Sequence, residues 1–228
     1  TDAECVLFLD ADDYLEPGTM KHWVEAVQGV DVAFGPFAFI EGGKHRPGHE
    51  LRQPATAATV IEDWLAGWFI APGAVLWRRA YLLSIGGWDE TLRQNDDGEL
   101  ALRAIIEGAR FAISDKGCFV YERHENPHRI TRRRGREISR QQIDILDSLL
   151  ERARRRGLMV DTAFGPAYYQ QAVNSFTNGF DELGQDALRK AREVGLKWHR
   201  GSLIHCTLAT LLGLRNKVRL RSSLRFAW

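Results

Sequence analysis

The feature that most constrains the fold is a short apolar run that ends in a cluster of acidic side chains. Residues 5–9 read Cys-Val-Leu-Phe-Leu, and Asp10, Asp12 and Asp13 follow directly. A continuous apolar run of this length predicts a strand that is covered on both faces. Because ligands bind at the carboxyl ends of strands in open α/β sheets, the pattern predicts an α/β fold with a binding site after this strand.

Strand and helix patterns alternate over the first half of the chain. Strands are predicted at residues 5–9, 30–40 with a break around Gly35 and Pro36, 73–77, 110–113 and 119–121. Helices are predicted at 20–27, 59–67, 80–85 and 99–107, and the Gly- and Pro-containing stretch 41–54 predicts a loop or hairpin. This alternation is typical of an α/β layer.

The second half of the chain differs in both periodicity and charge. Its apolar spacing predicts helices from residue 138 to near Gly157, and at 163–178, 181–194 and 203–212. Residues 1–128 hold 21 acidic and 11 basic side chains, whereas residues 129–228 hold 9 acidic and 20 basic ones. The acidic part suits a cation and the basic part suits phosphates or an anionic membrane, although two solvated faces can also differ by this much. We therefore expect a core domain at residues 1–131 and a basic helical region at 132–228.

Three carboxylates within four residues suggest a divalent cation. Asp10, Asp12 and Asp13 repel one another, and a bound cation removes that cost. Mg²⁺ or Mn²⁺ prefers oxygen ligands and is usually held by one or two carboxylates together with substrate phosphates. The alternative is an Asp-rich turn or helix start with no metal.

Residues 8–17 resemble the Asp-x-Asp signature of family 2 glycosyltransferases, which have the GT-A fold. The resemblance implies a Rossmann-like domain with a mixed central sheet, of which this chain would hold the C-terminal part. In that family the motif binds the metal and, through it, the diphosphate of the sugar nucleotide. The implied roles are direct metal ligand for Asp12, ribose or metal-water contact for Asp10, and support for Asp13.

Further motifs of the family follow in the expected order. Residues 72–79 resemble its strand beneath the acceptor site, and residues 86–90, Gly-Gly-Trp-Asp-Glu, are similar to its Gly-Gly-Phe-Asp-Glu segment. Residues 95–100 and Arg103 stand where the family has Glu-Asp-x-Asp-Leu and an arginine, which implies that Asp97 is the general base. Asp96 replaces the usual Glu of that motif and Glu99 the usual Asp.

Residues 121–125 are similar to the Tyr-Arg-x-His element of the family, whose histidine completes the metal shell. The matching residue is His124, although a lone histidine near a strand end is more often an ordinary surface or core residue. The aromatic side chains Trp68, Phe69, Trp77 and Trp88 offer either stacking surface for sugars or core packing.

The resemblance covers residues 5–131 and implies inverting, metal-dependent transfer of a sugar. The donor would be a nucleotide-diphosphate sugar, and the acceptor a hydroxyl of a polysaccharide or lipid-linked glycan. The family begins with strands that bind the nucleotide base, and no matching segment precedes Thr1. We therefore expect an N-terminally truncated domain that is inactive alone.

The basic segments offer two further contacts. Five arginines lie between residues 129 and 136, and Arg132 and Arg133 could pair with the diphosphate, or could simply be a solvated helix start. Residues 201–228 contain no acidic side chain and alternate basic with apolar residues. They predict either peripheral contact with an anionic membrane, at its cytoplasmic face, or a helix packed on the core.

Two other functions are weighed against sugar transfer. Residues 7–14 also resemble the nucleophile strand of haloacid-dehalogenase-like phosphatases, but that family has a threonine where Tyr14 stands. A non-catalytic basic module would leave the acidic motifs unexplained, so nucleic acid is not an expected partner. The widely spaced Cys5, Cys118 and Cys206 argue against a zinc site or disulfide framework and suit the cytoplasm.

Overall fold

The computed structural model describes residues 2–50, 55–67, 70–122 and 135–225, with side chains as far as residue 220. The chain divides into two compact units, Thr1–Pro127 and His128–Trp228. The domain boundary that the sequence predicts, between residues 131 and 132, falls in the stretch 123–134 outside the described residues.

The first unit contains two four-stranded sheets with mixed strand directions. In the first sheet the order is β1-β6-β3-β7, and only β3 and β7 are parallel. In the second sheet the order is β2-β8-β4-β5, and only β8 and β4 are parallel. The strands of the first sheet are β1 (Cys5–Leu7), β3 (Val32–Phe34), β6 (Val75–Arg78) and β7 (Phe111–Ile113). Those of the second are β2 (Tyr14–Leu15), β4 (Phe37–Glu41), β5 (Lys44–Pro47) and β8 (Phe119–Glu122).

The break predicted at Gly35 and Pro36 is confirmed, because the chain passes there from β3 in one sheet to β4 in the other. A Cβ atom at position 35 would lie 2.1 Å from the Trp23 ring, so the close approach of that indole requires glycine. Of the two alternatives predicted for residues 41–54, a loop or a hairpin, the structure has a hairpin: β4 and β5 pair in antiparallel register across Gly42 and Gly43, both with positive φ.

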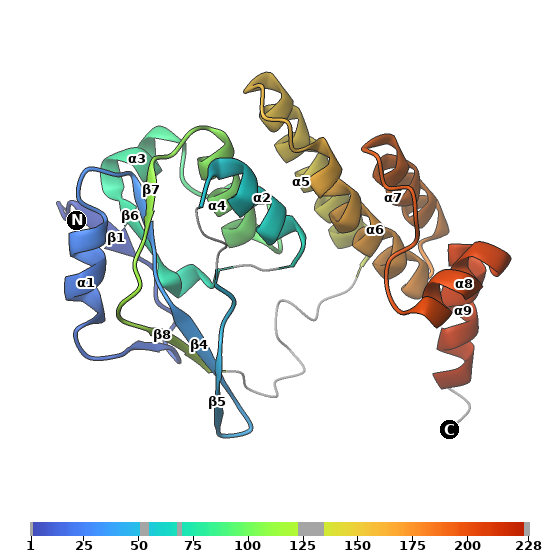
Figure 1. Ribbon diagram of the computed structural model, residues 1–228, viewed down its shortest axis with the longest axis horizontal. Helices are drawn as coiled ribbons and strands as arrows, with labels where there is room; N and C mark the ends of the chain where they lie inside the picture. The colour runs from blue at the N-terminus through green and yellow to red at the C-terminus, as the bar shows by residue number, and fades with distance from the viewer. Residues whose placement is uncertain (1, 51–54, 68–69, 123–134, 226–228) are drawn as a thin grey trace. The chain divides into compact units, whose positions relative to one another are not determined.

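Helices lie on both sides of the first sheet, with α1 on one side and α2 and α4 on the other (Figure 1). The Trp23 side chain of α1 is fully buried, and its indole N–H donates to the Lys116 carbonyl at 3.0 Å. The helical elements are α1 (Thr19–Ala26), α2 (Ala57–Leu65), the 3₁₀ turn η1 (Pro72–Ala74), α3 (Arg79–Ser84) and α4 (Asp96–Ile106). Each predicted helix is present, and α4 begins three residues earlier than its apolar pattern indicated.

The sequence prediction for the first strand is wrong in one respect. Cys5, Val6 and Leu7 are half-buried rather than covered on both faces. The reason is position: within the described residues β1 is an edge strand that pairs on one side only, with β6.

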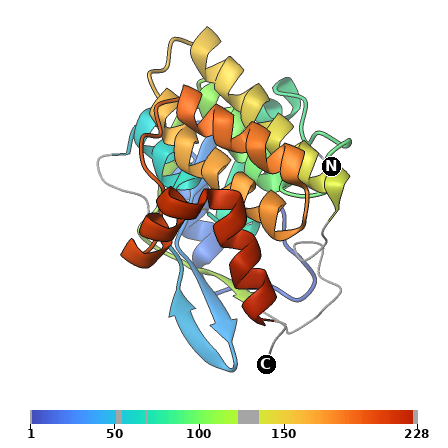
Figure 2. The same ribbon diagram turned by 90° about the vertical axis from the view of Figure 1, so that its right-hand side faces the viewer.

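The second unit is helical, as the periodicity predicts. Its helices α5, α6 and α7 pack together, and α8 and α9 lie against one another at one end of them (Figure 2). Their bounds are α5 (Arg136–Arg155), α6 (Asp161–Thr177), α7 (Asp181–Glu193), α8 (Leu203–Leu212) and α9 (Leu214–Arg225). Of the helices in the described ranges, none combines the length and the hydropathy that a bilayer span requires.

Tyr168, Asp147 and Lys190 form a linked polar group in this unit. The Tyr168 hydroxyl donates to Asp147 Oδ1 at 2.7 Å, and Lys190 Nζ lies 2.8 Å from Asp147 Oδ2. Burial and the Asp147 carboxylate raise the pKa of Tyr168. The fold class is therefore the predicted one, a mixed α/β unit followed by a helical region.

Candidate active site

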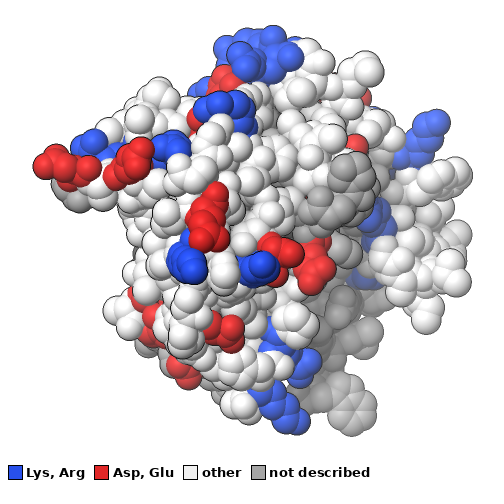
Figure 3. Space-filling model, turned by 60° about the vertical axis from the view of Figure 1, so that its left-hand side comes forward, with Lys and Arg blue, Asp and Glu red and all other residues white. Residues whose placement is uncertain are grey.

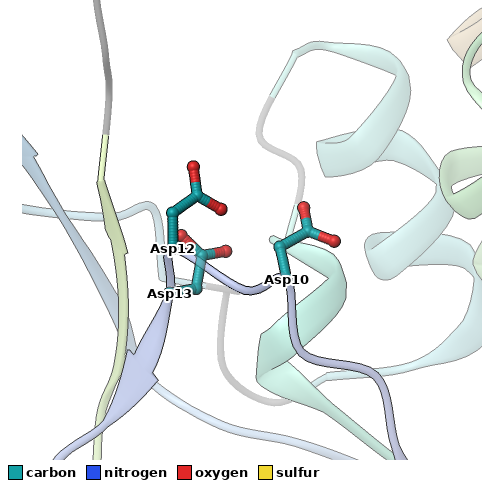
Figure 4. Close-up of side chains that lie close together, drawn as sticks. All are labelled: Asp10, Asp12 and Asp13. Carbon is teal, nitrogen blue, oxygen red and sulfur yellow. The ribbon is translucent and has the colours of Figure 1, made fainter.

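The three carboxylates of the acidic motif lie together in the turn between β1 and β2. Asp10, Asp12 and Asp13 each bring one carboxylate oxygen within 4.8 Å of the others. Figure 4 shows Asp12 and Asp13 on one arm of the turn and Asp10 on the other, with the carboxylates of Asp10 and Asp12 directed to the same side. Asp10 and Asp12 are exposed and Asp13 is half-buried, so an incoming ligand can reach the cluster.

Backbone contacts fix this turn. The Asp13 amide donates to the Asp10 carbonyl at 3.1 Å, which closes the turn. The Asp13 side chain in turn accepts from the Glu122 amide of β8 at 3.1 Å. Because the two residues are 109 positions apart, this bond ties the acidic turn to the second sheet.

The cluster fits a hard divalent cation. Oxygens bound to one octahedral Mg²⁺ at about 2.1 Å lie at most about 4.2 Å apart. The oxygens of Asp10, Asp12 and Asp13 are already within 4.8 Å, so small side-chain rotations would bring them to a common ion. Carboxylates are the ligands that Mg²⁺ and Mn²⁺ prefer, and the donor set contains no soft ligand.

Asp97 stands in the first turn of α4 with a perturbed pKa. Burial raises the pKa of this carboxyl above its usual value, and the negative charges of Asp96 and Asp10 raise it further. The contribution of Asp10 indicates that the acidic turn and the start of α4 lie within electrostatic reach of each other. Asn95, which precedes the helix, has φ of 63°, and it is the one non-glycine residue with positive φ in the described ranges.

Trp88 connects the two acidic groups. Its indole Nε1–H donates to Asp97 Oδ1 at 3.0 Å, which opposes the rise in the Asp97 pKa. Its ring also meets Phe8 edge to face, with centroids 4.2 Å apart, two residues before Asp10. The Trp88 side chain therefore contacts both Asp97 in the first turn of α4 and Phe8 in the segment that leads into the acidic turn.

A buried ion pair holds the loop that carries Trp88. Arg103 binds Glu99 through two bonds of 2.7 and 3.1 Å, and both side chains are about one-tenth exposed. The same guanidinium donates to the carbonyls of Ile85 and Gly87, each at 2.6 Å. Glu99 and Arg103 fall in the family motif that also holds Asp97, and the family resemblance implied no role for them. The i, i+4 spacing of Glu99 and Arg103 on an apolar helix was the sequence signal that could have predicted this ion pair.

Aromatic and aliphatic side chains line a hollow beside Asp97. Its lining comes from α2, η1, β6 and α4, and from the chain after β1, before η1 and before α4. Its lining side chains are Phe8, Trp64, Ile70, Pro72, Val75, Trp77, Trp88, Asp97, Leu100 and Ala101. Trp77 is only 3% exposed and is therefore core, whereas Trp88 is half-buried and reaches the surface.

Of the remaining predicted site residues, one lies beside Asp97 and the others lie outside the described residues. Asp96 is half-buried in the first turn of α4 and acts on Asp97 through its charge. His124, Arg132 and Arg133 lie outside the described residues, as do Trp68 and Phe69. The structure thus brings together Asp10, Asp12, Asp13 and Asp97, with Asp96 beside them.

The acidic excess of the first unit is not one continuous patch on the face shown in Figure 3. Asp and Glu side chains appear there in several separate places, with Lys and Arg between them. The carboxylates near Asp97 therefore stand out by their mutual closeness, not by a general negative field.

Two solved structures of residues 1–349 of S. aureus TarS resemble the whole chain. The complex with UDP-GlcNAc matches with a TM-score of 0.63 and 15% identity, over 100% of this chain and 69% of that one. The complex with UDP matches with a TM-score of 0.59 and 16% identity, over 100% and 68%. The sequence matches no protein-family model and no curated protein. The likeness concerns the fold, and it gives this chain a glycosyltransferase fold of the GT-A type.

Proposed function

We propose that the protein transfers a sugar from a nucleotide-diphosphate donor to an acceptor hydroxyl, as a metal-dependent, inverting family 2 glycosyltransferase. The observation that carries the proposal is the convergence of the Asp10–Asp13 turn and Asp97 in a glycosyltransferase fold. TarS, which has a similar fold, was solved with UDP-GlcNAc, which supports a nucleotide sugar as donor. Of the functions that the sequence left open, the fold likeness favours this one.

In the proposed site Asp12 and Asp10 hold the cation, and Asp13 supports the turn through its bond to the Glu122 amide. When bound, Mg²⁺ or Mn²⁺ supplies positive charge that stabilises the diphosphate leaving group. We assign His124 to the same shell on the family resemblance alone. We assign Arg132 and Arg133 to the diphosphate because they lie in an arginine-rich segment and guanidinium groups pair with phosphate oxygens.

Asp97 is the proposed general base. It accepts the proton of the acceptor hydroxyl while that oxygen bonds to the anomeric carbon and the bond from carbon to diphosphate breaks on the opposite face. A raised pKa suits this role, since a stronger base takes the proton more readily. Asp96 adds to that basicity by placing a second negative charge beside it.

The test is release of UDP from UDP-GlcNAc with Mn²⁺ and an acceptor panel, using the natural full-length protein. Asp97→Asn should abolish transfer while calorimetry still detects donor and Mn²⁺ binding. Asp12→Asn should instead weaken the metal-dependent binding of the donor. The matched control is Asp115→Asn, an exposed acid outside the cluster. Transfer at the wild-type rate by Asp97→Asn would refute the assignment.

We also propose peripheral contact with an anionic membrane at its cytoplasmic face, where a lipid-linked acceptor would be met. Within residues 201–228, α9 packs on α6 with Leu214 and Val218 buried, so its inner face belongs to the core. The proposal rests on α8, where Leu203 is 87% and Ile204 73% exposed. Basic residues without any acidic one surround this helix in the sequence after residue 193.

Vesicle flotation tests this contact. The double variant Leu203→Ser/Ile204→Ser should lose binding to vesicles that contain phosphatidylglycerol, whereas pure phosphatidylcholine should bind neither protein well. Met159→Ser is the matched control, because Met159 is 98% exposed and lies in the turn before α6. Equal binding by the double variant and the wild type would end the proposal.

A further inference from the structure

Trp88 occupies a position that the proposed reaction has not yet used. It lies in the loop between α3 and α4, and its ring is half-buried. The indole makes one contact to each side of the site: a hydrogen bond to Asp97 and an edge-to-face contact with Phe8. No other hydrogen bond engages the Asp97 carboxylate within the described part of the chain.

The hydrogen bond makes the two oxygens of this carboxylate unequal. Oδ1 accepts from the indole N–H at 3.0 Å, so one of its lone pairs is occupied and the plane of the carboxylate is held. Oδ2 keeps both lone pairs for a proton. A base that presents one defined oxygen needs less reorganisation when a hydroxyl arrives beside it.

The backbone that carries the Trp88 indole is fixed by hydrogen bonds from Arg103. Arg103, paired with Glu99, donates to the carbonyls of Ile85 and Gly87 and so fixes the backbone immediately before Trp88. Gly86 and Gly87 adopt φ of 85° and 64°, which allows the loop to turn back over α4. Glu99 and Arg103 belong to α4, the helix that also carries Asp97. The same helix therefore holds both Asp97 and the loop of its hydrogen-bond donor, Trp88.

We propose that Trp88 is a positioning residue, whose indole N–H holds Oδ1 of Asp97 and commits Oδ2 to the acceptor proton. Its contact with Phe8 fixes the distance between this base and the acidic turn. The inference rests on the proposed sugar transfer, in which Asp97 is the base. Other side chains around the carboxyl are consistent with this role: Asp96 and Asp10 are anionic, while α2 and β6 contribute uncharged rings to the hollow.

Trp88→Phe removes the N–H donor and keeps an aromatic ring that can contact Phe8. It also removes ring volume, a loss that the control variant Trp77→Phe shares. We expect kcat to fall by about 10- to 100-fold, the scale of one hydrogen bond to a charged group, with the KM for the donor unchanged. The N–H favours the ionised carboxylate, so its loss should move the acid limb of the kcat–pH profile to higher pH. Trp77→Phe is the control: it shrinks a buried indole of the same hollow, and its acid limb should stay in place whatever its rate.

A second readout does not depend on turnover. The ¹³C shift of the Asp97 carboxyl, titrated in the substrate-free protein, should give a higher pKa in Trp88→Phe than in the wild type, and an unchanged one in Trp77→Phe. An unchanged titration and an unchanged acid limb in Trp88→Phe would overturn the positioning role, even if Asp97→Asn is inactive. Transfer at the wild-type rate by Asp97→Asn would instead overturn the proposed function, so the two failures are distinguishable.

Discussion

The carboxylates of the helical unit and those of the acidic motif in the α/β unit have different partners. In the helical unit acidic side chains meet cations: Asp147 pairs with Lys190, Asp161 with Arg154, and Glu182 with Arg136. In the α/β unit Asp10, Asp12 and Asp13 have carboxylate oxygens within 4.8 Å of one another, and the charges of Asp96 and Asp10 raise the pKa of Asp97. Paired charges stabilise a fold, whereas clustered like charges cost stability. The second arrangement therefore indicates a site that awaits a ligand.

The largest expected difference concerns activity. Asp97→Asn should lower kcat by about 10²–10⁴-fold, because the acceptor hydroxyl loses its base. Asp147→Asn, in the helical unit, should leave kcat unchanged and lower the urea midpoint, because Lys190 and Tyr168 lose a charged partner. Parallel turnover and urea measurements on both variants check this, and equal kcat losses would erase the contrast between the units.

Two arginines sharpen the comparison next. Arg103→Met leaves the Glu99 carboxylate buried without its cation and should cost about 3–5 kcal/mol of unfolding free energy. Arg189→Met removes surface helix pairs with Glu193 and Asp186, of which Asp186 keeps Arg140, and should leave the urea midpoint almost unchanged. A small effect at Arg103 would mean that the Trp88 loop is held by other contacts.

Cation binding should stabilise the protein through the α/β unit alone. Mn²⁺ at about 100 times its dissociation constant should add about 2.7 kcal/mol to the unfolding free energy. Asp12→Asn should remove most of this gain, and Asp186→Asn, which breaks pairs with Arg140 and Arg189, should retain it. Thermal unfolding with and without Mn²⁺ measures both, and a gain that survives in Asp12→Asn would place the cation elsewhere.

The smallest expected effect is the pH dependence of stability. Asp97 has a folded-state pKa above its ordinary value of 3.8, so the folded chain keeps a proton that the unfolded chain has released. Stability from this group is therefore present below pH 3.8 and is lost as pH rises through the folded-state pKa. Urea titrations should show this loss in the wild type and not in Asp97→Asn. The opposite slope would contradict a raised pKa.

Local patterns in the sequence were sufficient for much of this architecture. The break at Gly35 and Pro36 and the helices α1 to α8 follow from turn residues and apolar spacing. The acidic motif also predicted its own cluster, since Asp10, Asp12 and Asp13 are neighbours in the chain. Burial of the first strand was not predictable in the same way, because it depends on which strands lie beside it.

The contacts that complete the candidate site join residues through tertiary structure. The hydrogen bond from the Glu122 amide to Asp13 joins residues 109 positions apart, so no local sequence pattern predicts it. Trp88 binds Asp97 across nine positions, and Arg103 binds the carbonyls of Ile85 and Gly87 immediately before Trp88. The sequence predicted a general base at Asp97 and a cation site at Asp10–Asp13. The Trp88 indole, which contacts Asp97 and Phe8, could be found only in the three-dimensional structure.

The most direct test of the account is the effect of Mn²⁺ on the NMR signal of the Trp88 indole N–H. If the cation binds at the Asp10–Asp13 turn beside the base, its unpaired electrons should broaden this signal at low Mn²⁺ concentration in the wild type. The broadening should disappear in Asp12→Asn. A Trp88 signal that stays sharp while calorimetry shows Mn²⁺ bound would contradict a single site made from the acidic turn and Asp97.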